Sequence, residues 1–197
     1  MADKVDIRIM AHKSRADNVQ KLLEALSLPE AAVTWDDRKD GGDALYTARK
    51  AWFAPMPKGC THRVVLADDA ETCEGFREIV EILAANHPDD IYTLFQQNAL
   101  IPGAPVANVC SKMVYGVGIM LPKDLIHPIF DEPIRPEDDM SVTFFAYARA
   151  LRILTPMPSI VQHLQMPSLL GNALGITSAS YTRTPKQDWT SKEIIDI

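Results

Sequence analysis

The alternation of apolar and polar residues over positions 5–10 predicts a β-strand with one buried face. The next apolar residues, among them Leu22 and Leu26, are spaced as on one side of a helix, and Pro29 ends that helix. A second apolar stretch at 32–35 predicts another strand. A strand, a helix and a strand in succession form a βαβ unit, whose two strands lie parallel in one sheet.

The rest of the chain continues to alternate between the two kinds of element. We expect strands at 63–67, 91–95 and 113–121, and helices at 44–53, 76–85, 123–130 and 141–154. The predicted fold class is therefore α/β, with a mostly parallel, Rossmann-like central sheet flanked by helices. The pattern weakens after Pro158, so we expect one domain over residues 1–172 and a partly ordered C-terminal tail over residues 173–197.

Composition and charge argue against several classes of protein. The 197 residues are 47% hydrophobic and 23% charged, as in ordinary globular domains. No apolar run approaches the roughly 20 residues that a membrane span needs. The net charge of −6, without a cluster of lysines and arginines, disfavours nucleic acid as a partner. Residues 1–8 lack the apolar stretch of a signal peptide, and the three cysteines lack metal-ligand spacing, so we expect a cytoplasmic protein with free thiols.

The strongest candidate for chemistry is the pair Asp68 and Asp69, which directly follows the apolar strand at 63–67. Ligands of open α/β sheets bind at the carboxyl ends of strands. Two adjacent carboxylates there need a cationic partner, and Mg²⁺ or Mn²⁺ carrying phosphate oxygens is a natural one. The alternative is that one of the two acids only caps the segment that follows.

Two further candidates lie in the second half of the chain. His163 could complete a site begun by Asp69, although a lone histidine is more often structural. Asp138 and Asp139 open the helix predicted from residue 141. They could serve as a general base, or they could simply be stabilised by the helix dipole.

Charged residues also follow the first two strands. Arg15 lies in the loop after the first strand, Asp36 ends the second, and Arg49 lies in the next helix. Such positions can hold the base, ribose or diphosphate of a nucleotide. A solvated charged surface is the alternative.

Taken together, these segments resemble the GT-A glycosyltransferases, which use nucleotide-diphospho-sugars, and in particular small bacterial or phage members. Residues 62–70 resemble the family's apolar strand running into a DxD-type metal motif, and 113–123 resemble the small-residue strand beside the donor sugar. Residues 137–139 resemble the acidic pair before the acceptor-side helix, and 158–163 resemble a proline-to-histidine segment whose histidine reaches the metal. The resemblance covers roughly residues 5–172.

The resemblance implies a metal-dependent enzyme that transfers a hexose or pentose from a UDP- or GDP-like sugar to a hydroxyl acceptor. The ion on the diphosphate is Mn²⁺ or Mg²⁺. The implied roles are nucleotide binding by Arg15, Asp36 and Arg49, donor contact by Asp68 and Gly116, metal binding by Asp69 and His163, and base catalysis by Asp139 or Asp138.

One departure from the family pattern keeps other functions open. Ala67 stands where many members carry the first acid of the motif. A non-catalytic nucleotide-sugar-binding or assembly protein with a degenerate GT-A fold is therefore the alternative. Among enzymes, a nucleotidyltransferase would use the same sheet and metal, but this sequence lacks the glycine-rich basic loop that such enzymes carry after the first strand. A glycosyltransferase acting on modified phage DNA bases is a further alternative, which the acidic charge disfavours.

Overall fold

The computed structural model describes residues 4–37, 44–97, 108–131, 135, 137–167 and 176–195. The helices are α1 (Ala16–Leu26), α2 (Ala44–Trp52), α3 (Phe76–Asn86), α4 (Lys123–Phe130) and α5 (Asp138–Ala148), with 3-10 turns η1 (Lys13–Arg15) and η2 (Glu30–Ala32). The strands are β1 (Val5–His12), β2 (Val33–Asp36), β3 (His62–Ala67), β4 (Ala70–Thr72), β5 (Ile91–Thr93), β6 (Asn108–Cys110), β7 (Gly118–Pro122), β8 (Ile153–Pro156), β9 (Val161–His163) and β10 (Ile194–Ile195).

Within these ranges the central sheet has eight strands in the order β10-β6-β8-β5-β7-β3-β1-β2. Four of its pairings are parallel, β1 with β2, β1 with β3, β5 with β8 and β6 with β10. Strand β7 runs antiparallel to both β3 and β5, and β6 runs antiparallel to β8. The predicted α/β class with a mostly parallel sheet is confirmed, and the antiparallel strands make the sheet mixed.

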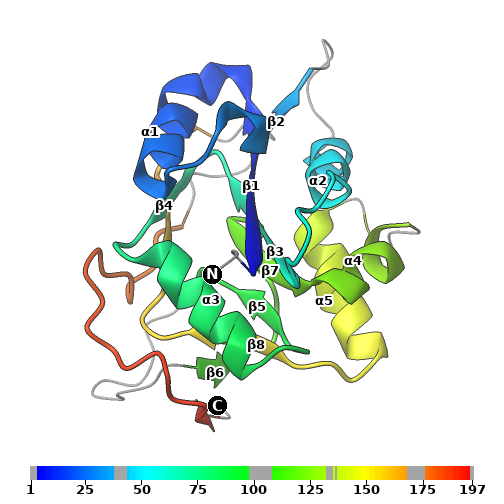
Figure 1. Cartoon of the computed structure of the whole chain (residues 1–197), viewed down its shortest axis with the longest axis vertical. Coiled ribbons are helices and arrows are strands. Elements are labelled where there is room, and N and C mark those ends of the chain that lie inside the picture. The colour runs from blue at the N-terminus through cyan, green and yellow to red at the C-terminus, as the bar shows by residue number, and fades with distance from the viewer. Residues whose placement is uncertain are drawn as a thin grey trace.

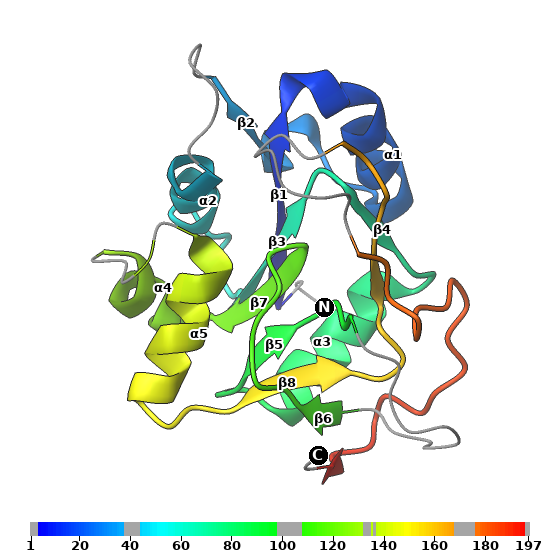
Figure 2. The same ribbon diagram turned by 180° about the vertical axis from the view of Figure 1, so that it is seen from behind.

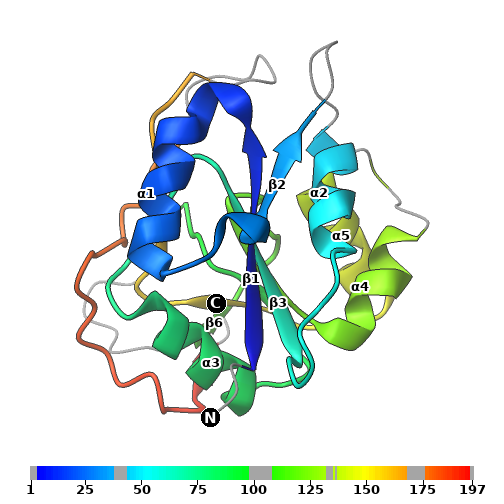
Figure 3. The same ribbon diagram turned by 45° about the horizontal axis from the view of Figure 1, so that its top comes forward.

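Helices cover both faces of this sheet. Figures 1 and 3 show α1 and α3 on one side and α2, α4 and α5 on the other. The core divides in the same way, because one buried cluster joins α3 to the sheet and another joins α2, α4 and α5 to it. The inner strand β3 packs on both faces, which explains the apolar run from Val64 to Ala67.

The βαβ start is confirmed. Helix α1 ends at Leu26 with Ser27 in the left-handed conformation, before the proline expected to stop it. Because β2 and β3 flank β1 on opposite sides, the connections through α1 and α2 place these helices on opposite faces. The carboxyl end of β1 is therefore the point where the strand order reverses. The charged loop at 38–43 lies outside the described residues.

Two predicted elements are wrong in extent. The helix expected over 141–154 begins earlier, at Asp138, and ends at Ala148, where Ala150 turns left-handed with φ 51° and β8 follows. The strand expected from 113 begins only at Gly118. Residues 114 and 115 instead donate their backbone N–H groups to the Thr143 and Thr93 hydroxyls, so side chains take the place of a neighbouring strand.

The described part of the C-terminal segment packs on the domain. Figure 2 shows it passing α3 toward β6, where β10 adds to the edge of the sheet. Trp189 is buried in the α3 cluster, and the Asn86 amide donates to the Trp189 carbonyl over 3.1 Å. A boundary between domain and tail at residue 172 stays a prediction, since residues 168–175 lie outside the described ranges.

Candidate functional site

The candidate site lies at the carboxyl ends of β1, β2 and β3. Strand β1 ends at His12, which pairs in register with Asp36 at the end of β2. On the other side of β1, strand β3 runs directly into Asp68 and Asp69. This is the switch point of the sheet, and α1 begins beside it (Figure 3). In open α/β sheets, ligands bind beyond the carboxyl ends of the strands at such a point.

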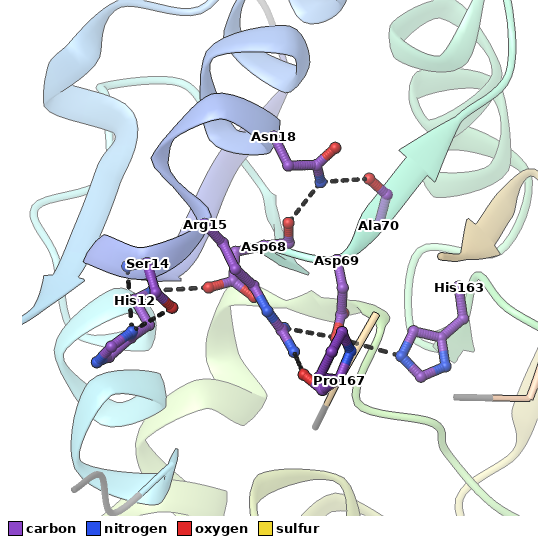
Figure 4. A network of polar contacts seen from close by, with 9 residues as sticks. All are labelled: His12, Ser14, Arg15, Asn18, Asp68, Asp69, Ala70, His163 and Pro167. Atoms are coloured by element: carbon purple, nitrogen blue, oxygen red, sulfur yellow. Dashed lines mark hydrogen bonds and ion pairs between the residues drawn. The ribbon is translucent and has the colours of Figure 1, made fainter. Parts of the chain in front are cut away.

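Arg15 joins the two acids that end β3, as Figure 4 shows. Its Nη1 lies 2.6 Å from Asp68 Oδ1 and 2.6 Å from Asp69 Oδ2. Its Nη2 donates to the carbonyl of Pro167 over 2.8 Å. The arginine side chain is only 8% exposed, so three acceptors replace its hydration. The cation that two adjacent buried carboxylates require is thus supplied by the protein itself.

The same strand end is held by two further polar contacts. The backbone N–H of His12 donates to Asp68 Oδ2 over 2.7 Å. The Asn18 amide, on the first turn of α1, donates to the Asp68 carbonyl over 2.5 Å. With Arg15 these groups come from one short stretch at the β1–α1 junction. His12 lies in the loop predicted after the first strand but was given no role, and Asn18, in the helix that follows, was missed.

His163 reaches Asp69 through a second, two-stranded sheet. Strands β4 and β9 pair antiparallel, with Ala70 opposite His163, and the Leu164 N–H donates to the Asp69 carbonyl. This places His163 Nε2 at 3.2 Å from Asp69 Oδ2. Burial raises the pKa of Asp69, but the hydrogen bond from His163 and the positive charge of Arg15 outweigh it, so the net shift is downward. The same two acids raise the pKa of Arg15 against its burial. Burial raises the pKa of Asp68, against the hydrogen bonds from His12 and Arg15.

Asp69 and His163 offer a divalent ion at most two side-chain ligands. Two ligands on neighbouring corners of an octahedral ion with bonds of 2.0–2.1 Å are about 3.0 Å apart, close to the 3.2 Å between His163 Nε2 and Asp69 Oδ2. In the described part of the chain, no group of three or more His, Cys, Asp or Glu side chains could hold a metal. Asp69 and His163 would therefore hold such an ion together with oxygens of a ligand or of water.

The second acidic pair lies at the start of α5. The Met140 N–H donates to Asp139 Oδ1 over 2.7 Å. Gly116 faces both acids, since a Cβ built on it would lie 3.5 Å from Asp139 Oδ2 and 3.6 Å from Asp138 Oδ1. The structure thus brings Gly116 together with the two residues expected as a base.

Asp138 is buried, and among the described residues its Oδ2 has no hydrogen-bond partner. Burial and then the neighbouring charge of Asp139 raise the pKa of Asp138 to about 7. Burial also raises the pKa of Asp139, although hydrogen bonding by the backbone of Met140 and Gly116 works in the opposite direction. Both carboxyl groups therefore hold a proton more readily than a solvated aspartate does.

The segment just before β7 lies between the two acidic pairs. The Ala67 N–H, next to Asp68, donates to the Val117 carbonyl over 3.0 Å. Gly116 directly precedes Val117 and lies beside Asp138 and Asp139. Chain segments far apart in sequence thus present both acidic pairs at the same edge of the sheet.

The structure does not bring Arg49 to this edge by any described contact. Helix α2 runs back from the carboxyl ends of the strands, and Arg49 lies in its last turn, with its guanidinium carbon 5.7 Å from the centre of the Phe53 ring. Asp36 does lie at the edge, beside His12. A nucleotide contact by either residue stays a prediction.

The sequence matches no protein-family model and no curated protein. Among solved structures, the chain is distantly similar to the inositol-1-phosphate CTP transferase from T. maritima, with a TM-score of 0.36 and 10% identity. That match covers 78% of this chain and 71% of the other. In the described ranges, no helix combines the length and apolar character needed to cross a bilayer.

Proposed function

We propose that this protein is a metal-dependent glycosyltransferase that moves a hexose or pentose from a nucleotide-diphosphate sugar to a hydroxyl acceptor. The observation that carries the proposal is the pairing of two different acidic sites at one sheet edge. One site, Asp68 and Asp69, is bridged by the Arg15 guanidinium and contacted by His163. The other, Asp138 and Asp139, has raised pKa values and lies against Gly116. Inverting glycosyl transfer to a hydroxyl uses both, one for the diphosphate and one for the acceptor proton.

The proposed donor lies across the carboxyl ends of β1 and β2. Asp36 contacts the nucleoside, Arg49 stays a further candidate for that role, and Arg15 pairs with the diphosphate, for which its planar guanidinium is suited. Asp69 and His163 hold Mn²⁺ or Mg²⁺, which neutralises the charge that develops on the leaving diphosphate. Asp68 supports this arrangement through its ion pair with Arg15.

The acid pair on α5 takes the acceptor side. Asp139 is the less buried of the two, and we assign it the removal of the proton from the acceptor hydroxyl. Its pKa is raised by burial, which makes the carboxylate a stronger base. With a pKa of about 7, Asp138 is protonated in about half of the molecules at neutral pH, and the protonated form can donate a hydrogen bond. This division of roles applies to an inverting enzyme, since a retaining enzyme needs no such base.

The test is a panel of nucleotide-diphosphate sugars, each added to the protein with and without Mn²⁺, read as a shift in melting temperature. A donor that binds the folded chain raises that temperature by mass action. We expect one or more sugars to do so only with Mn²⁺ present. Asp69→Asn should remove the Mn²⁺-dependent shift, whereas the exposed control Asp17→Asn should keep it.

Slow hydrolysis of the donor in the same mixtures separates the remaining functions. Release of a nucleoside diphosphate supports glycosyl transfer. Release of pyrophosphate from a nucleoside triphosphate and a sugar phosphate would instead identify a nucleotidyltransferase. Binding without any turnover would identify the non-catalytic protein that Ala67 leaves open. Donor turnover only when hydroxylated DNA bases are added would identify a DNA-modifying enzyme.

A further inference from the structure

The C-terminal segment is anchored where helix α3 ends (Figure 2). The Asn86 amide donates to three successive backbone carbonyls at residues 189–191, over 3.1, 3.3 and 3.4 Å. A few residues further on, Ile194 pairs with Asn108 at the start of β6. His87 follows Asn86 in the chain and contacts Asn108, so it joins these two attachments.

His87 belongs to a row of buried polar side chains. It is 7% exposed, and Asn108 and Tyr92 are 0% exposed. Its Nε2 lies 3.4 Å from Asn108 Nδ2, and Asn108 Oδ1 accepts from the Tyr92 hydroxyl over 3.2 Å. Its Nδ1 lies 3.7 Å from Asp90 Oδ2, and Arg152 donates to both oxygens of Asp90 over 3.0 and 2.8 Å. Because His87, Asn108 and Tyr92 are closed off from water, each depends on a partner within the protein.

The contacts of His87 specify a neutral imidazole with its proton on Nδ1. This nitrogen faces the carboxylate of Asp90, which accepts, so Nδ1 is the nitrogen that carries the proton. Nε2 then has a lone pair that accepts from the Asn108 amide, and the oxygen of that amide accepts from Tyr92. Donors and acceptors alternate correctly along the row when the ring is neutral.

A second proton on His87 conflicts with this row. The new Nε2–H would face the N–H groups of the Asn108 amide, so two donors would oppose each other. Turning the amide over would present its oxygen to the ring, but the buried Tyr92 hydroxyl would then face N–H groups and lose the acceptor for its own proton. Either arrangement leaves a buried polar group unsatisfied.

The surroundings of His87 also oppose its positive charge. Burial is the largest cause of its lowered pKa, Asp90 works in the opposite direction, and Arg152 and Lys192 repel a proton from the ring. Among the described residues these are the charged groups that act on His87, and the titratable Tyr92 ring lies 6.4 Å from it, centre to centre. Lys192 belongs to the C-terminal segment itself, so docking of the segment and protonation of the ring oppose each other.

We propose that His87 is a pH-sensitive latch for the C-terminal segment, and that protonation of its imidazole releases residues 189–195 from α3 and β6. Release takes Lys192 away from the ring and opens the row to water, where the second proton finds an acceptor. A solvated histidine has a pKa of about 6.5 and docked His87 has a lower one. Docking is therefore strongest above about pH 6.5 and weakens as the pH falls below that value. The inference does not depend on the proposed function.

The experiment is amide hydrogen exchange of the full chain, with protection factors corrected for the intrinsic effect of pH. Protection over residues 189–195 measures the fraction of molecules in which the segment is released. We expect this fraction to rise by up to about tenfold between pH 7.5 and pH 5.5, because a solvated histidine changes from mostly neutral to mostly charged over this range. Asp138 lies on α5, on the other face of the sheet, so its titration should not contribute.

The amides of β3 serve as the internal reference. Equal protection of residues 189–195 at both pH values would overturn the latch. An equal loss of protection in β3 would overturn it too, because the whole domain would then be opening rather than the segment alone.

His87→Gln separates the titration from the packing. Glutamine can accept from the Asn108 amide as the imidazole does, but it never takes up a proton. The released fraction should then be nearly the same at both pH values. The matched control is His127→Gln, which changes an exposed histidine beside Asp131 and should keep the full response. A response in His87→Gln as large as that of the wild type would overturn the assignment to His87.

Lys192→Gln gives a second test that holds if His87→Gln does not fold. Lys192 is exposed, so the fold tolerates its loss. Without this charge the docked ring takes up a proton more readily, so the response to acid should be smaller than in the wild type. Lys186→Gln, an exposed change in the same segment, should leave the response unchanged. A response in Lys192→Gln as large as that of the wild type would contradict the opposition between docking and protonation on which the latch depends.

Discussion

The two aspartate pairs have the same composition and different surroundings. Asp68 and Asp69 follow a buried strand and are met by Arg15, His163 and a backbone N–H. The pKa of Asp69 is lowered despite burial, whereas burial raises the pKa of Asp68 in spite of its contacts with His12 and Arg15. Asp138 and Asp139 begin a helix, where burial raises both pKa values. Within the described residues, no basic side chain forms an ion pair with this second pair. The first pair thus faces a guanidinium and a histidine, and the second lacks such partners among these residues.

The difference shows that an Asp-Asp motif acquires its chemistry from what faces it. The strand-end pair faces the β1–α1 junction, which supplies Arg15, and the two-stranded sheet, which supplies His163. The helix-start pair faces Gly116, which supplies no charge. Variants that change one pair and leave the other intact test this difference.

The largest effect is expected from Asp139→Asn. If Asp139 takes the proton from the attacking hydroxyl, or from water in donor hydrolysis, turnover should fall by about 10²- to 10⁴-fold with donor affinity nearly intact. The asparagine oxygen can still accept from the Met140 N–H, so the fold is preserved. The measurement is nucleoside diphosphate release and donor affinity, side by side with Asp138→Asn and with exposed Glu137→Gln as the control. Full turnover in both aspartate variants would point to a retaining enzyme or to acids that only stabilise the helix.

Arg15→Met breaks the other pair. It leaves two adjacent buried carboxylates without their guanidinium, and losing one partner of a buried ion pair costs about 3–5 kcal/mol of unfolding free energy. Urea unfolding at pH 7 measures the loss. Lys13→Met, an exposed change in the same turn, should stay within about 0.5 kcal/mol. An equally small change for Arg15→Met would mean that another group neutralises Asp68 and Asp69.

Asp138 should make the stability of the fold depend on pH. Its pKa is about 7 in the folded chain, against about 3.9 when unfolded, so the folded state keeps a proton that the unfolded state releases. Stability contributed by this group should fall as the pH rises from about 4 to about 7, by up to about 1.4 kcal/mol per pH unit, and stay level above that range. Urea unfolding at pH 5, 6 and 7 should show that slope in the wild type and its loss in Asp138→Asn. The control Glu137→Gln should keep the slope. A slope that persists in Asp138→Asn would mean that another group holds the proton.

The smallest effect separates the two possible roles of His163. His163→Ala should weaken Mn²⁺ binding in the presence of nucleotide by about 10-fold or more. The unfolding free energy should fall only by about 0.5–1.5 kcal/mol, through the edge-to-face contact with Phe95. Titration of Mn²⁺ and urea unfolding on the same sample give both numbers. A large loss of stability with unchanged metal affinity would make His163 structural.

The sequence by itself determined the elements with a strong local pattern. The alternation at 5–10, the helical spacing before Pro29 and the apolar run before Asp68 gave the βαβ start and the strand end that carries the acids. These predictions hold because burial of one face of a strand or helix imposes a period on the apolar residues along the chain. The position of Arg15 after the first strand also marked it as a site residue, on the same reasoning about strand ends.

Tertiary structure alone decided which charges meet. Nothing local to His163 specifies that β9 pairs with β4 and sets it beside Asp69, and nothing local to Arg15 specifies that it binds two carboxylates of β3 rather than solvent. The short strands β6, β8 and β10 and the end of α5 at Ala148 likewise follow from pairing partners distant in the chain. Strands of two to four residues carry too few positions to show a period, and an ion pair depends on the distance between two charges, which only the packed fold fixes.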